Sequence, residues 1–102
     1  MYRGTTPTIE IELDFSTDVI DALYLTFKQC DEVVFEKTQD DMETDEYNLN
    51  IIRVKLTQEE TLQLQCKNCV YMQVRAKLID GTALAYEPFS FVVQDVFKEG
   101  EI

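Results

Sequence analysis

Two cysteines separated by two residues, Cys66 and Cys69, are the side chains of this sequence best suited to chemistry. Such a pair supplies two of the four ligands of a structural zinc site, or forms a redox-active dithiol. The chain has no histidine and one further cysteine, Cys30, so the remaining zinc ligands are missing. A redox pair is activated at the beginning of a helix, whereas this pair follows a short predicted helix. We interpret it as an ordinary turn and expect no metal and no cofactor.

The absence of histidine also limits catalysis. It removes the commonest general base and the Ser–His and Cys–His nucleophile systems. Adjacent carboxylates such as Glu59 and Glu60 can do acid–base chemistry, but among 20 acidic residues such neighbours are expected by composition. No glycine-rich phosphate loop is present. The sequence therefore predicts a binding or assembly protein without catalytic, cofactor-binding or metal-binding residues.

Alternating acids at Asp41, Glu43 and Asp45 are spaced like the first ligands of a calcium loop. The sixth position of that motif requires glycine, which is missing here, and Ile52 occupies the twelfth position, where a bidentate glutamate belongs. We therefore expect residues 39–46 to form a solvated loop.

The charge balance, 9 basic against 20 acidic residues and a net charge of −11, excludes some partners. Nucleic-acid phosphates and anionic membrane surfaces would repel such a chain. No apolar run approaches the ~18 residues of a membrane span, and residues 1–7 do not resemble a signal peptide. We expect a cytoplasmic start, with which an odd number of cysteines agrees. The charge either keeps the domain soluble or forms an acidic face for a basic partner.

Residues 8–15 give the clearest structural signal. Ile9, Ile11 and Leu13 alternate with polar or acidic residues, which predicts a half-buried strand with one face in water. A short helix is predicted after Thr57, because Thr57 and Glu60 have the spacing of a capping box. One helical turn is expected at residues 18–21. Further strands are expected at residues 23–27, 33–37, 47–56, 70–78 and 82–95, the last interrupted at Pro88.

Turns separate these strands. Asp80 and Gly81 predict a type I′ hairpin turn, in which both central residues have positive φ, and residues 29–32 predict another turn. The phase of the alternation slips at Ile51 and Ile52, which suggests a bulge. A chain of 102 residues is the size of one domain, and we expect residues 1–7 and 96–102 to be loose ends.

Six or seven short strands with one short helix predict an all-β protein, a β-sandwich of immunoglobulin-like topology. The disulfide and the buried tryptophan of antibody domains are not expected, because the chain has no tryptophan. One core is predicted from the residues that share the period-two alternation, namely Ile9, Ile11, Leu13, Leu49, Val70, Met72, Val74 and Leu78.

The second half of the chain resembles a phage family. Residues 56–62 (LTQEETL), the long strand that ends near Arg75, and Asp80-Gly81-Thr82 are similar to the N-terminal domain of phage upper baseplate proteins. They are still more similar to small uncharacterised proteins encoded by phages and prophages of Gram-positive gut bacteria. Residues 3–8 (RGTTPT) and 92–96 (VVQDV) fit the same pattern, whereas the segment from Cys66 to Cys69 departs from it. The resemblance implies a β-sandwich that functions in virion assembly, and it carries no active-site residues.

The leading hypothesis is a non-enzymatic phage or prophage structural or assembly module that contacts other phage proteins. It would be located in the bacterial cytoplasm and then in the virion, and a homo-oligomer is compatible with the sequence. The alternative is a bacterial immunoglobulin-like domain that binds carbohydrate or another small ligand. The expected contact surface combines an exposed edge strand with the acidic loop, at Glu10, Glu12, Asp14, Asp40, Asp41, Glu43, Asp45 and Glu46.

The interpretation of the cysteine pair gives a first prediction. Purified protein should contain no stoichiometric metal, because three cysteines and no histidine cannot supply the usual four zinc ligands, and Cys66 and Cys69 should support no turnover. Elemental analysis yielding about one zinc per chain would contradict this, as would reductase activity lost in a Cys66→Ser/Cys69→Ser variant.

Overall fold

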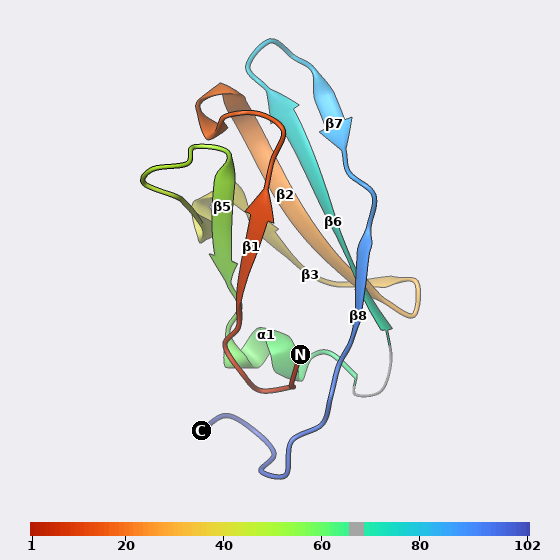
Figure 1. The fold of residues 1–102 in the computed structure, drawn as a ribbon. Helices are drawn as coiled ribbons and strands as arrows, with labels where there is room; N and C mark the ends of the chain where they lie inside the picture. Colours follow the sequence, from red (N-terminus) through yellow and green to blue (C-terminus); the bar gives the residue numbers. More distant parts are fainter. Residues whose placement is uncertain (66–68) are drawn as a thin grey trace.

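The computed structural model describes residues 1–65 and 69–102, and most of the ordered chain is β-strand (Figure 1). Short 3₁₀ turns lie at Thr17–Val19 and Gln39–Asp41, and one α-helix, α1, spans Gln58–Leu62. The strands are β1 Thr8–Glu12, β2 Ile20–Gln29, β3 Glu32–Thr38, β4 Met42–Thr44, β5 Ile51–Lys55, β6 Cys69–Leu78, β7 Ala83–Ala85 and β8 Phe89–Val92.

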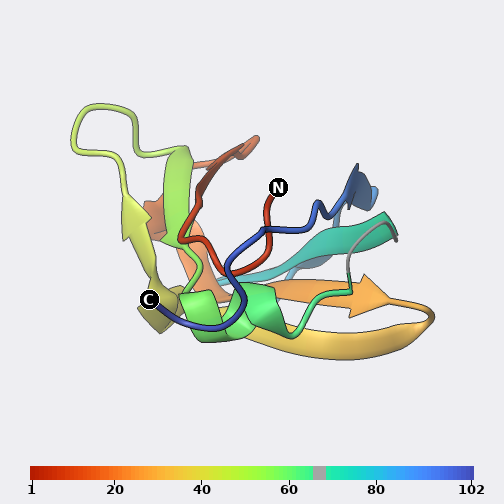
Figure 2. The ribbon, with the colours of Figure 1, turned by 90° about the horizontal axis from the view of Figure 1, so that it is seen from below.

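The strands form two antiparallel sheets. The smaller sheet has the order β1-β5-β4, and the larger has the order β3-β2-β6-β7, with β8 also pairing with β6. The chain passes between the sheets from β3 to β4 through Gln39–Asp41. On the opposite side, β1 and β8 are the outer strands of their respective sheets (Figures 1 and 2).

One hydrophobic core lies between the sheets. Strand alternation places one side chain in two on this inner face, as in β6, where Val70, Val74 and Ala76 are buried. The centre is filled by Phe27, whose ring stacks on Phe35 with centroids 4.4 Å apart. Five residues of the predicted core are buried, Ile11, Leu13, Val70, Met72 and Val74, while Ile9 and Leu78 pack against it at the margin.

Leu49 is an exception, with 44% of its surface exposed. The predicted strand at residues 47–56 is wrong in its first half, because residues 45–50 form a turn and β5 begins at Ile51. The Asp45 carboxylate accepts hydrogen bonds from the backbone N–H groups of Tyr47 and Asn48, which stabilises the turn against strand pairing. The apparent slip in alternation is therefore the beginning of a strand and not a bulge.

The acidic loop also contains a strand that the sequence did not predict. Met42–Thr44 forms β4 and pairs with β5 through Glu43 opposite Arg53 and Met42 opposite Val54. A three-residue strand with a single apolar side chain gives too little alternation to be recognised. Pairing with β5, a tertiary interaction, decides its structure.

The type I′ turn that the sequence predicted at Asp80 and Gly81 occurs instead at the turn between β2 and β3. At Asp80 and Gly81, only Gly81 has a positive φ, 92°, and Gly81 N–H donates to the Leu78 carbonyl, so the hairpin has a three-residue loop instead of a type I′ turn. The turn between β2 and β3 does have two positive φ values, 54° at Cys30 and 61° at Asp31. The type I′ geometry therefore occurs at a sequence without glycine.

The capping box of α1 forms as predicted. Glu60 N–H donates to Thr57 Oγ1, and the Glu60 carboxylate accepts from Thr57 N–H at 2.9 Å. Glu60 also pairs with the buried Lys37 of β3, with Nζ and Oε1 2.8 Å apart. This ion pair joins the helix to the larger sheet and satisfies a buried charge.

Both terminal segments, expected to be loose, make specific hydrogen bonds. Arg3 donates to the Leu62 and Leu64 carbonyls at the end of α1, and Gln94 N–H donates to the Met1 carbonyl. The Ile102 backbone N–H donates to the Gln58 side chain at 2.8 Å. The termini thus contact the end of the molecule that carries α1.

The burial pattern predicts different effects for two leucines. Leu13→Ala should lower the free energy of unfolding by about 2–4 kcal/mol, because it opens a cavity in the core. Leu49→Ala, the matched control, should cost about 1 kcal/mol or less, because Leu49 is half exposed. Urea denaturation measures both values, and equal effects would contradict the burial assigned to these side chains.

Candidate functional site

The outer edge of β1 presents backbone groups without a partner strand. Just beyond the ends of β1 and β5, Leu13 N–H donates to the Asn50 carbonyl and the Pro7 carbonyl accepts from Leu56 N–H. In this register the odd-numbered residues of β1 hydrogen-bond to β5. Antiparallel ladders alternate, and the N–H and C=O groups of Glu10 and Glu12 therefore point away from β5. Within the described residues, β1 pairs with β5 alone. β1 is thus an open edge strand, as we predicted for residues 8–15.

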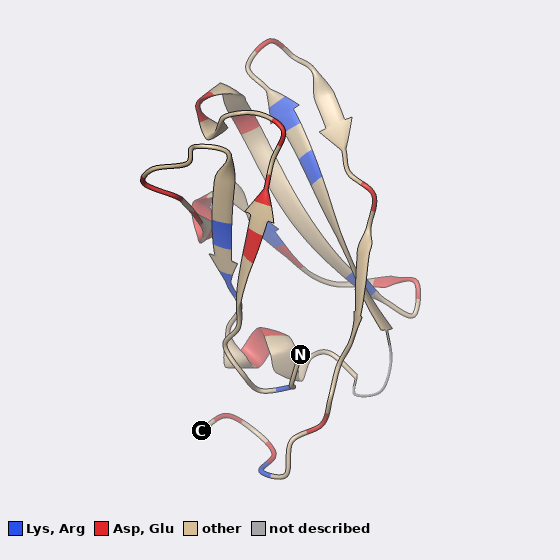
Figure 3. Ribbon diagram, in the orientation of Figure 1, with Lys and Arg blue, Asp and Glu red and all other residues tan. Residues whose placement is uncertain are grey.

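The acidic side chains converge on the outer face of the smaller sheet. Glu10 and Glu43 lie on either side of Arg53 in register, one on each neighbouring strand. Arg53 Nε donates to Glu10 Oε2 at 3.0 Å, and its Nη2 donates to Asp45 Oδ2 at 2.7 Å. Figure 3 shows the acidic positions of β1 and of the turn before β5, with basic positions of β5 between them. We call this surface, formed by Glu10, Glu43 and Asp45 around Arg53, the acidic face.

Among the carboxylates of the acidic face, Asp45 has the pKa that departs most from its usual value. The hydrogen bond from Arg53, together with those from the Asn48 and Tyr47 amides, lowers the pKa of Asp45 to about 2. The hydrogen bond to Asp45 in turn raises the pKa of Arg53, so this central positive charge persists. Asp45 therefore holds the turn and the arginine in place and is less available to a partner than its neighbours.

The remaining acids of the predicted contact surface are not all in one place. Glu12, the last residue of β1, and Asp14, two residues beyond it, are exposed. Asp41 lies near Glu43 beside a shallow hollow on the acidic face. Asp40 lines a different hollow, together with residues of β2, so it belongs to another side of the molecule. Glu46 is exposed in the turn after Asp45. Asp40 was included in the predicted contact surface only because it is close in sequence to the other acids of residues 39–46.

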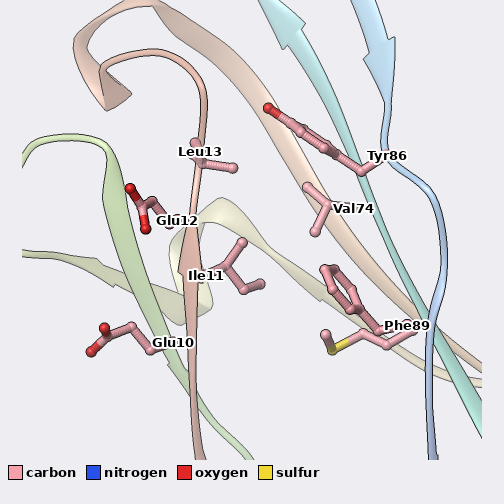
Figure 4. A pocket seen from close by; sticks show the side chains of 8 residues that line it. Glu10, Ile11, Glu12, Leu13, Val74, Tyr86 and Phe89 are labelled. Atoms are coloured by element: carbon pink, nitrogen blue, oxygen red, sulfur yellow. The ribbon is translucent and has the colours of Figure 1, made fainter.

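A groove beside β1 is the feature that sequence analysis missed. It has a volume of about 360 Å³ and lies between β1 and the segment that joins β7 to β8. Ile11 and Val74 point into it, whereas Glu10 and Glu12 point to the far side of β1 (Figure 4). Its lining residues are Glu10, Ile11, Glu12, Leu13, Met72, Val74, Tyr86 and Phe89.

Phe89 shows that the groove is an uncovered part of the core. It pairs with the buried Met72 and lies on the same face of the larger sheet, yet 57% of its surface is exposed. The same strand carries Val92, which faces outward and is exposed to a similar degree, 50%. An inward-facing phenylalanine is exposed here because no strand of the described chain covers the space between β1 and β8. The alternation of Phe89 and Phe91 predicted a strand, but it gave no indication that the inner face of this strand would be exposed.

Both ends of the groove are closed by contacts. At one end, Tyr86 reaches across to β1, and its hydroxyl accepts a 3.4 Å hydrogen bond from Asp14 N–H (Figure 4). At the other end, Tyr2 forms a parallel bridge with Gln94, and Arg3 N–H donates to the Gln94 carbonyl at 2.9 Å. The open part therefore corresponds to the length of β1 between these contacts.

The thiols show no built chemical site in the described part of the chain. Cys30 is exposed in the turn between β2 and β3, and Cys69 is exposed at the beginning of β6. Cys66, the other member of the predicted pair, lies outside the described residues. Among residues 1–65 and 69–102, no group of three or more potential metal-ligating side chains is found. In these same ranges, no helix has the length and apolar character to cross a bilayer.

Comparison of the chain with protein-family models, with curated proteins and with solved structures found no match.

The electrostatics of the acidic face give a prediction on pH dependence. Because the pKa of Asp45 lies below its usual value, the ionised carboxylate stabilises the fold fully above pH about 5, and this contribution is lost as the pH falls towards 2. Asp45→Asn should therefore lower the free energy of unfolding by a constant amount above pH about 5, and by progressively less below it. Urea unfolding at several pH values measures the difference.

Glu46→Gln is the matched control, because its carboxylate is exposed in the same turn and forms no ion pair among the described residues. It should leave the pH profile of stability unchanged. A destabilisation by Asp45→Asn that is the same at all pH values would refute the assigned role of its charge.

Proposed function

We propose that this chain is a non-enzymatic phage or prophage structural or assembly protein that acts through protein–protein contacts. The observation that carries the contact function is the free edge of β1, flanked by an acidic outer face and an uncovered apolar groove. The phage assignment rests on the sequence resemblance described above. The partners would be other phage structural proteins, met in the bacterial cytoplasm and then in the virion.

We also propose that the fold is immunoglobulin-like. The strand orders β1-β5-β4 and β3-β2-β6-β7 correspond to the orders B-E-D and C′-C-F-G of immunoglobulin domains. In this correspondence α1 occupies the connection between E and F, and β7 with β8 forms an interrupted strand G. Strand A, which pairs with B in those domains, has no counterpart among the strands of the described residues, and its place is the free edge of β1.

A free edge strand favours assembly over simple solubility. Unpaired N–H and C=O groups are a template for pairing with another chain, and proteins that do not use such an edge usually blunt it. Pro88 lies at the break between β7 and β8 and can blunt that side, whereas β1 has no proline within its strand. The acids of β1 oppose self-pairing and leave the edge available to a basic or neutral strand.

The alternative, carbohydrate binding, would require exposed aromatic rings gathered on one surface. The exposed tyrosines of the larger sheet, Tyr24 and Tyr71, lie on neighbouring strands. Tyr24 pairs with Arg75, which lies four residues after Tyr71 on β6. The two tyrosines are therefore about 13 Å apart along the strand direction. Rings so far apart do not stack on one sugar, so this face of the larger sheet does not offer a carbohydrate platform.

The test of the proposed function is affinity capture from a phage-producing lysate, with captured proteins identified by mass spectrometry. We expect recovery of a virion structural protein, and a loss of at least about tenfold in binding after Glu10→Lys/Glu12→Lys/Asp14→Lys. Binding should also weaken as salt is raised, because part of the attraction is between exposed charges.

A second triple variant, Asp21→Lys/Glu32→Lys/Glu59→Lys, is the matched control. It changes the net charge equally at exposed positions away from β1 and should leave binding nearly unchanged. Recovery of a glycan ligand without any structural protein would overturn the proposal, as would equal effects of the two triple variants.

A further inference from the structure

We propose that the groove beside β1 takes an extended segment of another protein, with apolar residues facing the groove and Lys or Arg facing outward. The inserted segment pairs with the free edge of β1 and covers the exposed core side chains. This inference rests on the proposed function as a protein-contact module, and it names the kind of partner and how that partner binds.

The backbone of β1 provides the pairing groups. The N–H and C=O groups of Glu10 and Glu12 point away from β5, toward the side on which the groove lies. The next N–H in that row, from Asp14, already donates to the Tyr86 hydroxyl. An inserted strand would satisfy the other groups in the same direction by β-strand addition.

The direction of the inserted segment is indicated by the chain itself. Residues 1–3 run parallel to the end of the β8 segment, where Tyr2 forms its bridge with Gln94, and they fill the space between the two sheets at that end. β1 and β8 run in opposite directions (Figure 1). A segment that continues the course of residues 1–3 is therefore antiparallel to β1 and parallel to β8.

The interior of the groove determines the inward side chains. Met72 and Val74 form its floor and are 6% and 2% exposed, while Phe89 stands at its margin with 57% of its surface exposed. Between Glu10 and Asp14, an inserted strand would extend over about 13 Å, which is four to five residues. Because side chains alternate, about two of them enter the groove, and branched or aromatic apolar residues match its lining.

The charges around the groove determine the outward side chains. Among the described residues, no Lys or Arg lines it, and its acids are Glu10 and Glu12; Asp14 and Glu87 line a neighbouring hollow beyond Tyr86. Glu10 is paired with Arg53, whereas Glu12, Asp14 and Glu87 form no ion pair within the described residues. Outward side chains of an inserted strand lie beside those of β1, where opposite charges stabilise a strand pair. Basic outward residues therefore complete the pattern.

A second copy of β1 does not fit this pattern. Antiparallel self-pairing centred on Ile11 would place Glu10 of each copy opposite Glu12 of the other. Like charges directly opposite each other destabilise a strand pair. The groove therefore favours a partner of different sequence over a second copy of this edge.

A synthetic nine-residue peptide that alternates Lys with Val or Ile is the direct probe. We expect it to bind the full chain in fluorescence anisotropy, and we expect the amides of Glu10 and Glu12 to exchange with solvent at least about tenfold more slowly in the complex. A peptide with Glu in place of Lys, and one of the same composition without the alternation, should bind at least about tenfold more weakly.

Two variants locate the site. Phe89→Asp should weaken peptide binding at least about tenfold, because it puts a charge in the groove, while Val92→Asp, on the opposite face of the same strand, should change it less than about twofold. Glu12→Pro removes one outward N–H and leaves the ladder to β5, and it should also weaken binding. Circular dichroism confirms that each variant is folded, and Glu12→Pro provides the test if Phe89→Asp is not.

The outcomes separate this inference from the proposed function. Failure of the alternating peptide to bind, equal effects of Phe89→Asp and Val92→Asp, or binding without protection of the Glu10 and Glu12 amides would each overturn strand insertion. Capture of a virion protein that still depends on the acids of β1 would then leave the proposed function standing. Binding of the peptide with the expected protection, but with no structural protein captured, would support the groove site and contradict the assembly function.

Discussion

The antiparallel pairing of β1 with β5 determines how the surface of this protein is organised. Its register places Glu10 opposite Arg53 and Ile11 opposite Ile52, so acids face outward while apolar side chains enter the core. Since β5 already has β4 on its other side, β1 is left at the edge of the sheet, and its outward backbone groups have no partner strand among the described residues. An edge strand with unpaired N–H and C=O groups can pair with a strand of another chain. The proposed contact function follows from this single geometric fact.

The two sides of β1 have different chemistry, and together they describe one kind of partner. On the outer face, Arg53 holds Glu10 and Asp45 in fixed positions, and Glu12 remains unpaired within the described ranges. On the inner side, Phe89 faces the core but is not covered by it. A charged face alone would attract many basic molecules, and an apolar groove alone would attract many apolar ones. The combination at a free strand edge selects an extended segment whose side chains alternate in the same way.

Alternation in the sequence identified the strands that are long and half buried. β1, β2, β3 and β6 and the capping box at Thr57 were all predicted, because each depends on local pattern or local hydrogen bonding. β4 was missed because its structure depends on pairing with β5. Leu49 was wrongly placed in the core because the Asp45 carboxylate stabilises a turn where a strand was predicted. The edge position of β1 was predicted, but the groove was not, because it depends on the distance between two sheets that no local pattern records. Glu10, Asp41, Glu43 and Asp45 lie around Arg53 through the pairing of β1, β5 and β4, whereas Asp40 lies elsewhere.

The account depends on β1 having a free edge in the isolated protein, and amide hydrogen exchange read residue by residue by NMR measures this directly. The N–H group of Ile11 bonds to β5, that of Leu13 bonds to the Asn50 carbonyl just before β5, and both should be strongly protected. The N–H groups of Glu10 and Glu12 should exchange nearly as fast as in an unfolded chain. A period-two pattern of slow and fast exchange along β1 is therefore expected. Protection at Glu10 and Glu12 equal to that at Ile11 would show that the edge is already paired, and it would contradict the account.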